Sequence, residues 1–324
     1  MNKSQNGRIV VTGASGFIGS RLCDYLESHG EEVVALTRKS ELQKTSVAVD
    51  LVEGSLHDNF LHGVRVIVHC AARAHVTREY SSEPMSEYRR MNVDATLKLA
   101  SQAARSGVQR FIFLSSIGVN GNSTYSDFHP RSPLIFDESL TPSPHDMYAI
   151  SKWEAELRLW ELQRETGMEV VIIRPPLVYG PGAKGNFSTL LDWVSKGAPL
   201  PLKMVNNERS LLALDNLVSF IEQCINHPKA ANELFVIADG EDVSTAELLR
   251  RVARANGKNA RLVPFPVSLM FLMARILGKQ SVADSLFGSL KVEPLKAKRL
   301  LGWKPVVTMD EQLRKCCEPV GRKS

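Results

Sequence analysis

Two residues of one short segment have the types and the spacing that suit proton transfer. In YAISK, Tyr148 and Lys152 are four positions apart, which places them on one face of a helix. A phenol ordinarily ionises near ~10 and is a poor base at neutral pH, but a nearby ammonium favours the phenolate. The pair predicts a tyrosine that carries a proton, although most Tyr/Lys pairs of this spacing only form a solvated helix face.

A pair of serines supplies the next polar group. Ser115 and Ser116 follow the apolar run RFIFL, where the sequence predicts the carboxyl end of a strand. Open α/β sheets bind their ligands at these strand ends. We therefore expect the serines to lie at the same site as Tyr148.

A glycine-rich loop comes first in the chain. VVTGASGFIGS places Gly13, Gly16 and Gly19 between an apolar strand and a helix. Small residues let the backbone turn tightly and approach a pyrophosphate, which the free N–H groups of the helix N-terminus then stabilise. The loop predicts a dinucleotide site, and the alternative is a turn that only packs.

The end of the second strand bears on the choice of cofactor. Thr37 stands 24 positions after Gly13, close to the roughly 20 expected for an acidic residue that binds the adenosine ribose. A carboxylate would repel a 2′-phosphate, whereas Arg38 or Lys39 could pair with one. The sequence thus favours NADP over NAD, unless the two cations are only solvated surface.

These groups require a parallel sheet to position them. Nearly continuous apolar runs predict strands covered on both faces, and long helical patterns ending in Gly30, Gly107 and Gly167 separate them. The alternation predicts an α/β fold with a doubly wound (Rossmann) parallel sheet. The five expected strands are RIVVTG, EEVVALT, VRVIVHCAA, RFIFLSS and MEVVIIRPP.

The texture of the sequence changes after Arg174, where RPPLVYGPGAKGNF is too rich in proline and glycine for one regular element. We predict an NAD(P)-binding domain in residues 1–178 and a smaller, mixed substrate-binding lobe in residues 179–324. Residues 213–239 are a candidate to complete the sheet, and NELFVIADG (232–240) is a candidate strand.

The bulk composition is that of an ordinary globular protein, with 324 residues, 44% hydrophobic and 23% charged. The net charge of +5 is scattered without interleaved aromatics, so no nucleic-acid partner is expected. Five cysteines fit neither a zinc spacing nor a disulfide framework, which favours no metal and a reducing cytoplasm. The polar N-terminus shows no secretory signal.

One late stretch is strongly apolar. VSLMFLMARILG (267–278) is shorter than the roughly 20 residues of a membrane span, and Arg275 interrupts it. We expect a buried or dimer-facing helix there, with a membrane-surface helix as the alternative, and no membrane partner.

Taken together, GxxGxxG, the serine pair, YxxxK and RPPLVYGPG resemble the extended short-chain dehydrogenase/reductase family, in particular its sugar-nucleotide epimerases and reductases. The resemblance runs from Gly13 to LGWKP (301–305). SSIGVNG and NNERSLLALDNL are similar to bacterial polysaccharide-cluster proteins labelled 4-epimerases or UDP-N-acetyl-hexosulose 4-reductases.

The resemblance implies roles for particular residues. Ser116 would bind the sugar hydroxyl or ketone, Tyr148 would transfer its proton, and Lys152 would tune Tyr148 and bind the nicotinamide ribose. Asn92 would brace the site and Arg209 would hold the substrate diphosphate. The other implied contacts are to the cofactor from Gly13, Ser15, Gly16, Phe17, Ile18, Gly19, Thr37, Arg38, Leu56, Ala71, Ala72, Asn92 and Lys152, and to the substrate from Asn186.

The residues after Ser116 narrow the implied reaction. Sugar dehydratases and decarboxylases of this family carry carboxylates there, and this chain has Ile117, Gly118 and Val119. Hydride transfer at C4 of a UDP-linked hexose or N-acetylhexosamine remains. A 4-keto reductase fed by pooled NADPH is favoured over a 4-epimerase that retains NAD, and a non-catalytic regulator is a remote alternative.

The sequence departs from the family's commonest epimerase pattern at three places. Thr37 replaces the acidic residue at the strand end, and Ser55 replaces an aspartate near the adenine. A later arginine that grips the diphosphate has no match in SVADSLFGSLKVEP (281–294).

The resemblance also implies a homodimer, with helices starting near Tyr80 and Met147 packed across the two-fold axis. The dimer is also supported by an apolar stripe on the second helix, which is larger than one core-facing side would need. The stripe consists of Trp153, Leu157, Trp160 and Leu162.

Overall fold

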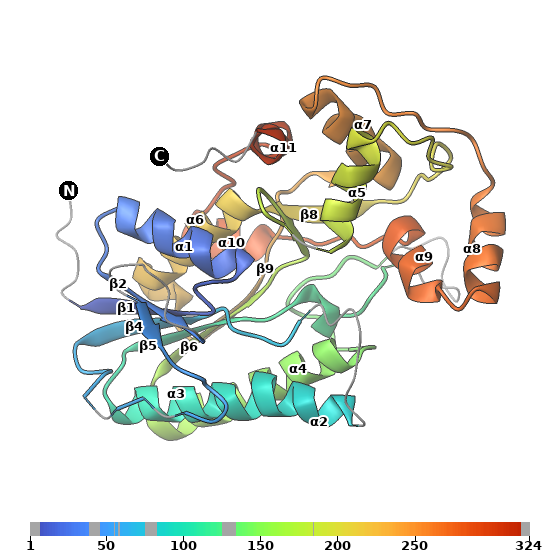
Figure 1. Ribbon diagram of the computed structural model, residues 1–324. Coiled ribbons are helices and arrows are strands. Elements are labelled where there is room, and N and C mark those ends of the chain that lie inside the picture. The colour runs from blue at the N-terminus through green and yellow to red at the C-terminus, as the bar shows by residue number, and fades with distance from the viewer. Residues whose placement is uncertain are drawn as a thin grey trace.

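Seven parallel strands form the main sheet of the protein in the computed structural model (Figure 1). The structure describes residues 7–38, 46–54, 56–57, 59–74, 83–124, 134–183 and 185–318. The sheet order is β3-β2-β1-β4-β5-β6-β9. The strands are β1 (Arg8–Thr12), β2 (Val33–Thr37), β3 (Ser46–Ala48), β4 (Val64–His69), β5 (Arg110–Leu114), β6 (Glu169–Arg174) and β9 (Glu233–Val236). The five expected strands are present, whereas β3 was not expected.

Helices cover both faces of this sheet, as its buried strands require. On one face lie α1 (Phe17–Ser28), α6 (Leu214–Asn226) and α10 (Leu295–Leu301), and on the other lie α2 (Pro84–Arg89), α3 (Ala95–Arg105) and α4 (Met147–Thr166) (Figure 1). Each layer has its own apolar core against the sheet. The architecture is the predicted doubly wound α/β fold.

The strand order changes direction between β1 and β4. From β1 the chain builds outward through β2 and β3, then crosses back to β4 and builds the other way through β5 and β6. The strands β1 and β4 are neighbours, and the loops that follow them lead away from each other, toward β2 and toward β5. A crevice for a ligand forms at such a point, outside the carboxyl ends of the strands.

The long helix expected before Gly107 contains an irregularity. A π-helical turn, Arg90–Asp94, joins α2 to α3. It holds Asn92, whose side chain is fully buried. Such turns interrupt the regular ladder of helix hydrogen bonds and are frequent at functional sites.

The smaller lobe stands above the carboxyl edge of the sheet in Figure 1. Its three-stranded sheet has the order β10-β8-β7. The lobe comprises β7 (Leu177–Tyr179), β8 (Arg209–Ala213), β10 (Asp242–Val243), α5 (Asn186–Ser195), α7 (Thr245–Ala255), α8 (Val267–Ile276), α9 (Gln280–Phe287) and α11 (Met309–Cys317). Two short 3₁₀ turns follow β5 and α6, at Ile117–Val119 and Pro228–Ala230. The strand expected in residues 232–240 is β9, and it pairs with β6 in the main sheet.

Two apolar segments differ from expectation. On α4, Trp160 and Leu162 pack against the sheet core, so only part of the predicted dimer stripe is free. Leu157 and Met147 are 47% and 45% exposed, and Tyr80 lies outside the described residues. The helix α8 is not buried within the chain, because one of its apolar sides faces solvent, and its expected place at a dimer contact stays a prediction.

Candidate active site

The loop after β1 is shaped by close backbone contacts. Gly13 has φ 65°, and a Cβ added to it would lie 2.8 Å from the backbone nitrogen of Ala71 after β4. A Cβ on Gly19 would lie 2.3 Å from the carbonyl oxygen of Gly13. These distances exclude side chains at both positions. No described side chain caps α1 at Gly16, so the first N–H groups of the helix remain available for an anion.

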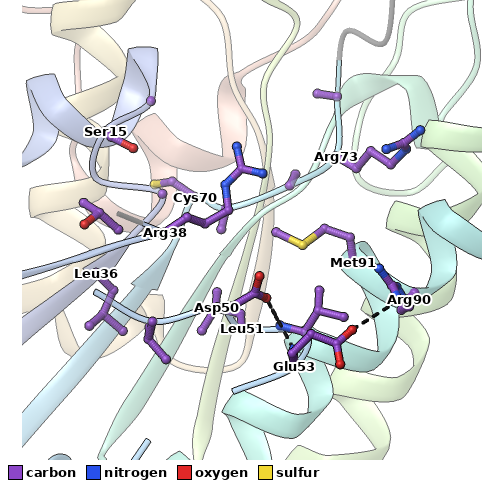
Figure 2. A pocket seen from close by; sticks show the side chains of 18 of the residues that line it. Ser15, Leu36, Arg38, Asp50, Leu51, Glu53, Cys70, Arg73, Arg90 and Met91 are labelled. Atoms are coloured by element: carbon purple, nitrogen blue, oxygen red, sulfur yellow. Dashed lines mark hydrogen bonds and ion pairs between the residues drawn. The ribbon is translucent and has the colours of Figure 1, made fainter. Parts of the chain in front are cut away.

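A pocket of about 470 Å³ opens beside this loop (Figure 2). It suits a dinucleotide in size and in position, because it lies at the switch in strand order. Seven predicted cofactor residues line it: Gly13, Ser15, Gly16, Thr37, Arg38, Ala71 and Ala72. The glycine cradle and the free helix N-terminus therefore fit a bound dinucleotide phosphate.

Other predicted cofactor residues do not line the pocket. Phe17 and Ile18 begin α1 and pack against the core, and Leu56 is buried on the opposite face of the sheet. Asn92 and Lys152 are almost fully buried and are not among the residues that line the pocket. Lys39 and Ser55 lie outside the described residues.

The pocket wall also contains residues that the sequence did not predict. Residues 49–53 follow β3 and line one side, and Arg73, Arg90 and Met91 line another. A prediction of β3 would have indicated the first group, because strand ends meet at this edge. The three-residue strand was too short to show in the pattern.

The charges around Arg38 are mixed. Its side chain extends toward the pocket in Figure 2, above Asp50 and Glu53. Backbone N–H groups of Val52 and Glu53 lower the pKa of Asp50, and the charges of Arg38 and Arg90 lower it further. Arg90 also pairs with Glu53 at 3.2 Å. Arg38 therefore faces a carboxylate across the pocket as well as solvent.

The two serines after β5 have different surroundings. Ser115 is buried and donates its hydroxyl hydrogen to the carboxylate of Glu156. Ser116 is only half-buried, and its oxygen accepts a hydrogen bond from the Gly118 N–H at 3.1 Å. The Ser116 hydroxyl hydrogen has no acceptor among the described residues. Ser116 is therefore the serine with a free donor at this edge.

The first turn of α4 positions the predicted proton carrier. Asp146 caps the helix by accepting the Ala149 N–H at 2.7 Å, and Tyr148 follows at the second helical position. Tyr148 is half-buried, and its hydroxyl forms no hydrogen bond with a described residue. Lys152 is almost fully buried, and its Nζ lies 5.9 Å from the Tyr148 ring centroid.

Burial shifts the pKa of both members of the Tyr148/Lys152 pair. Burial lowers the pKa of Lys152 to about 8. The Lys152 ammonium donates to the Leu114 carbonyl at 2.8 Å and lies over the Phe113 ring. Burial, with the nearby charges of Asp146 and Tyr88, raises the pKa of Tyr148 instead of lowering it. The expected activation of the phenol by Lys152 stays a prediction, and in this arrangement desolvation is the largest influence on the pKa of Tyr148.

Asn92 connects the pocket wall to α4. Its side-chain oxygen accepts the Arg73 N–H at 2.7 Å, and its amide donates to the Arg73 carbonyl at 3.1 Å. The amide also donates to the Ser151 hydroxyl at 2.9 Å, which in turn donates to the carbonyl of Tyr148. The π-helical turn thus places one amide where it holds both the loop after β4 and the helix that carries Tyr148.

A buried ion pair lies beneath the serines and was not predicted. Arg174, at the end of β6, donates to Glu156 of α4 at 3.0 Å, and both side chains are nearly inaccessible. Arg174 also donates to the side chain of Asn120 at 2.9 Å. The pair ties β6, α4 and the turn after Ser116 into one unit.

Two residues predicted to bind substrate, Arg209 and Asn186, lie in the small lobe, and Arg209 does not line the pocket beside the glycine loop. Arg209 begins β8, and its guanidinium donates to the carbonyl of Gly288 at 3.0 Å. Burial lowers its pKa. Asn186 begins α5, but its side chain is outside the described part of the structure. Among the described residues, no cluster of His, Cys, Asp and Glu could hold a metal ion.

Comparison with known proteins identifies the family. The model of the NAD dependent epimerase/dehydratase family matches residues 9–238. The chain belongs to this family. It is 41% identical over 315 residues to a UDP-glucose 4-epimerase of Vibrio cholerae, covering 96% of this chain and 94% of the relative.

More distant relatives and solved structures of the same fold extend the comparison. An N-acetyl-alpha-D-glucosaminyl-diphospho-ditrans,octacis-undecaprenol 4-epimerase of Escherichia coli O157:H7 is 25% identical over 291 residues, covering 87% of this chain and 84% of its own. A crystal structure of UDP-glucose 4-epimerase from Thermotoga maritima with UDP-glucose has a TM-score of 0.74 at 23% identity, covering 96% and 97% of the two chains. A UDP-glucuronic acid 4-epimerase from Bacillus cereus in complex with NAD has a TM-score of 0.75 at 20% identity, covering 95% and 94%. These two structures show the shared fold.

Proposed function

We propose that the protein is an NAD-dependent 4-epimerase of a UDP-linked hexose or N-acetylhexosamine. The observation that carries the proposal is the 41% identity to a UDP-glucose 4-epimerase across nearly the whole of both chains. The geometry supports it, because the free hydroxyls of Ser116 and Tyr148 lie at the carboxyl edge of the sheet with the Lys152 ammonium beneath them.

The proposed roles follow from these positions. Tyr148 takes the proton of the sugar C4 hydroxyl and later returns it to the same oxygen, after the 4-keto sugar has turned over so that the hydride reaches the opposite face of C4. The Ser116 hydroxyl donates to the same oxygen when C4 is a ketone. Lys152 supplies positive charge behind Tyr148. A bound nicotinamide would accept the C4 hydride and return it, and Gly13, Ser15 and Gly16 would hold its diphosphate.

The comparisons favour a 4-epimerase over the 4-keto reductase that the sequence had favoured. We expected a pool-fed reductase ahead of an epimerase, chiefly because of Thr37 and Arg38. The relatives named above are 4-epimerases, and one neighbour of the same fold was solved with NAD. We therefore place the epimerase first. It uses the same catalytic groups and returns the cofactor to its starting state.

A product analysis tests this proposal. The purified protein is incubated with UDP-glucose, and separately with UDP-N-acetylglucosamine, without added reductant. Nuclear magnetic resonance should show the C4 epimer of at least one sugar accumulating to an equilibrium mixture. The matched control is Tyr148→Phe, which should give no epimer. If neither sugar is converted, the assignment of a UDP-sugar 4-epimerase on these substrates is wrong.

One observation keeps an NADP-dependent 4-keto reductase as the second candidate. Arg38 and Thr37 line the pocket where an adenosine ribose would lie, and an arginine there can pair with a 2′-phosphate. If this is its role, wild type binds NADPH more tightly than NADH, and Arg38→Ala removes the difference. Equal dissociation constants in the wild type would contradict an NADP preference. Consumption of NADPH with a 4-keto sugar would support the reductase over the epimerase.

We further propose the organisation expected from the sequence. Residues 1–178 with β9 form the cofactor domain and residues 179–324 the substrate-binding lobe, with Asn186 and Arg209 on the substrate side. All five cysteines are free, as a reducing cytoplasm would keep them. A homodimer would bury the exposed Leu157 and Met147 of α4, and a monomeric mass at micromolar concentration would contradict it.

A further inference from the structure

The helix α8 is apolar on two opposite sides. Its inner side packs against the small lobe through Met270, and through Phe271, whose ring lies 5.3 Å from that of Phe287 on α9. Its outer side repeats apolar residues with the spacing of one helix face and is open to solvent: Leu269, Leu272, Met273 and Ile276 are 43%, 53%, 48% and 75% exposed. A helix on the surface of a water-soluble domain ordinarily has polar residues on its outer side.

Exposed apolar residues continue beyond the helix. Leu277 is 65% exposed and Val282 on α9 is 50% exposed. Val263, just before α8, and Met204 are exposed as well, and the Lys203 N–H donates to the Val263 carbonyl and joins their two segments. We call these eight residues the α8 surface. It lies at the end of the small lobe that is farthest from α1 in Figure 1.

The charged residues on the segments that carry the α8 surface are basic, and the carboxylates next along the chain are Asp284 on α9 and Glu208. Residues 196–207 and 256–283, which carry the surface and its surroundings, include no aspartate or glutamate. They carry six basic residues, all exposed: Lys196, Lys203, Lys258, Arg261, Arg275 and Lys279. None of the six forms an ion pair with a described carboxylate. Exposed basic residues therefore accompany the apolar residues on the segments that carry the α8 surface.

We propose that the α8 surface binds the anionic face of a phospholipid bilayer. Apolar side chains of an interfacial helix enter the boundary between headgroups and acyl chains, while lysines and arginines beside it bind anionic headgroups. A second copy of the chain fits less well, because a two-fold contact would bring two surfaces of the same positive charge together. No helix among the described residues is long and apolar enough to cross a membrane, so the contact would be peripheral. This inference replaces our expectation of no membrane partner.

Hydrogen bonds connect the end of α9, which carries Val282 of the α8 surface, to the segment that contains Arg209, a residue proposed to bind substrate. At the end of α9, the carbonyl of Gly288 accepts hydrogen bonds from Asn207 at 2.8 Å and from Arg209 at 3.0 Å. A bilayer bound at α8 would therefore lie next to the segment of the small lobe that leads through Gly288 to Arg209. The docking itself does not depend on the proposed reaction, and either can fail without the other.

Sedimentation with lipid vesicles tests the proposal on the full-length protein. Vesicles are made of phosphatidylcholine alone, or with about one third phosphatidylglycerol to supply negative charge. We expect wild type to sediment with the anionic vesicles at least about tenfold more strongly than with the neutral ones. Failure to sediment with anionic vesicles, or equal sedimentation with both, overturns the proposal.

Surface variants localise the contact. Leu272→Ser with Ile276→Ser, and separately Arg275→Glu with Lys279→Glu, should each reduce anionic vesicle binding by about tenfold or more. Both pairs are exposed and should leave the fold intact. The matched control is Leu295→Ser with Val306→Ser, two exposed apolar residues elsewhere, which should bind like wild type. Unchanged binding by the α8 variants, or a change in their molar mass showing a protein–protein interface instead, overturns the assignment.

Discussion

The candidate active site has two layers that use their polar groups differently. The rim, Ser116 and Tyr148, is half-buried, and each hydroxyl keeps a hydrogen that no described residue accepts. The buried layer consists of Ser115, Glu156, Arg174 and Asn120, and its polar side chains bond to one another. The difference separates residues placed to meet a substrate from residues that hold the rim in position.

Lys152 lies between the two layers. It is buried like the lower layer, but it approaches the ring of Tyr148 and carries the charge nearest to the rim. Its ammonium is held by one backbone carbonyl and an aromatic face, so most of the cost of burying the charge is not offset. This explains a depressed pKa beside a tyrosine whose own pKa is raised.

The largest effect should come from removing the proton carrier of the rim. Tyr148→Phe should lower kcat by about 10²- to 10⁴-fold, because general acid–base catalysis is lost while little volume changes. The dissociation constant of the cofactor and the free energy of unfolding should stay near wild type. A variant that keeps more than about a tenth of wild-type kcat would show that another group moves the proton.

The corresponding change in the buried layer should act on stability. Glu156→Gln leaves the Arg174 guanidinium buried without a carboxylate, and should cost about 3–5 kcal/mol of unfolding free energy in urea. The matched control is Glu154→Gln on the same helix, whose carboxylate pairs with Arg89 at 2.7 Å near the surface. That change should cost less than about 1 kcal/mol. Equal costs would mean that the buried pair has no special part in holding the rim.

The adjacent serines provide the sharpest contrast between the layers. Ser116→Ala should reduce kcat/KM about tenfold, the value of one hydrogen bond to the reacting oxygen, with stability unchanged. Ser115→Ala should lower the free energy of unfolding by about 1 kcal/mol and leave kcat/KM nearly intact. The two measurements together assign each serine to its layer, and reversed results would exchange the roles.

The smallest effect should be a pH dependence of stability from Lys152. Its pKa is about 8 in the folded protein and 10.5 ordinarily. Between these values the unfolded chain binds a proton that the folded protein does not, so this group makes unfolding free energy rise with pH across that window. Below it the lysine is charged in both states and destabilises the fold. Lys152→Met should remove this rise, measured by denaturant unfolding from neutral to alkaline pH, and an unchanged profile would contradict the depressed pKa.

The sequence predicted the parts of the molecule that local patterns determine. Five apolar runs indicated β1, β2, β4, β5 and β6, and the glycines indicated a loop whose contacts exclude a Cβ at Gly13 and Gly19. It missed β3, because three residues show no period, and with it the pocket wall at residues 49–53. It also missed the π-helical turn around Asn92, because one extra residue in a turn leaves the apolar pattern of a helix nearly unchanged.

The remaining features depend on contacts between distant segments. Glu156 and Arg174 are ordinary surface residues by type, and only the packing of α4 on β6 buries them together. The direction of the Tyr148 pKa shift depends on how much water the folded chain removes, which the YAISK pattern does not contain. In the same way, the apolar character of α8 was evident in the sequence, but its outward orientation was not.

The central claim is that one site removes the C4 hydride of a sugar nucleotide and returns it to the same carbon. The most direct test uses UDP-glucose carrying deuterium at C4, incubated with the protein and an excess of unlabelled free cofactor. Our account predicts that the C4 epimer forms with deuterium retained at C4, because the cofactor stays bound between the two transfers. Formation of an epimer that has lost its deuterium, or the absence of any epimer, would contradict it.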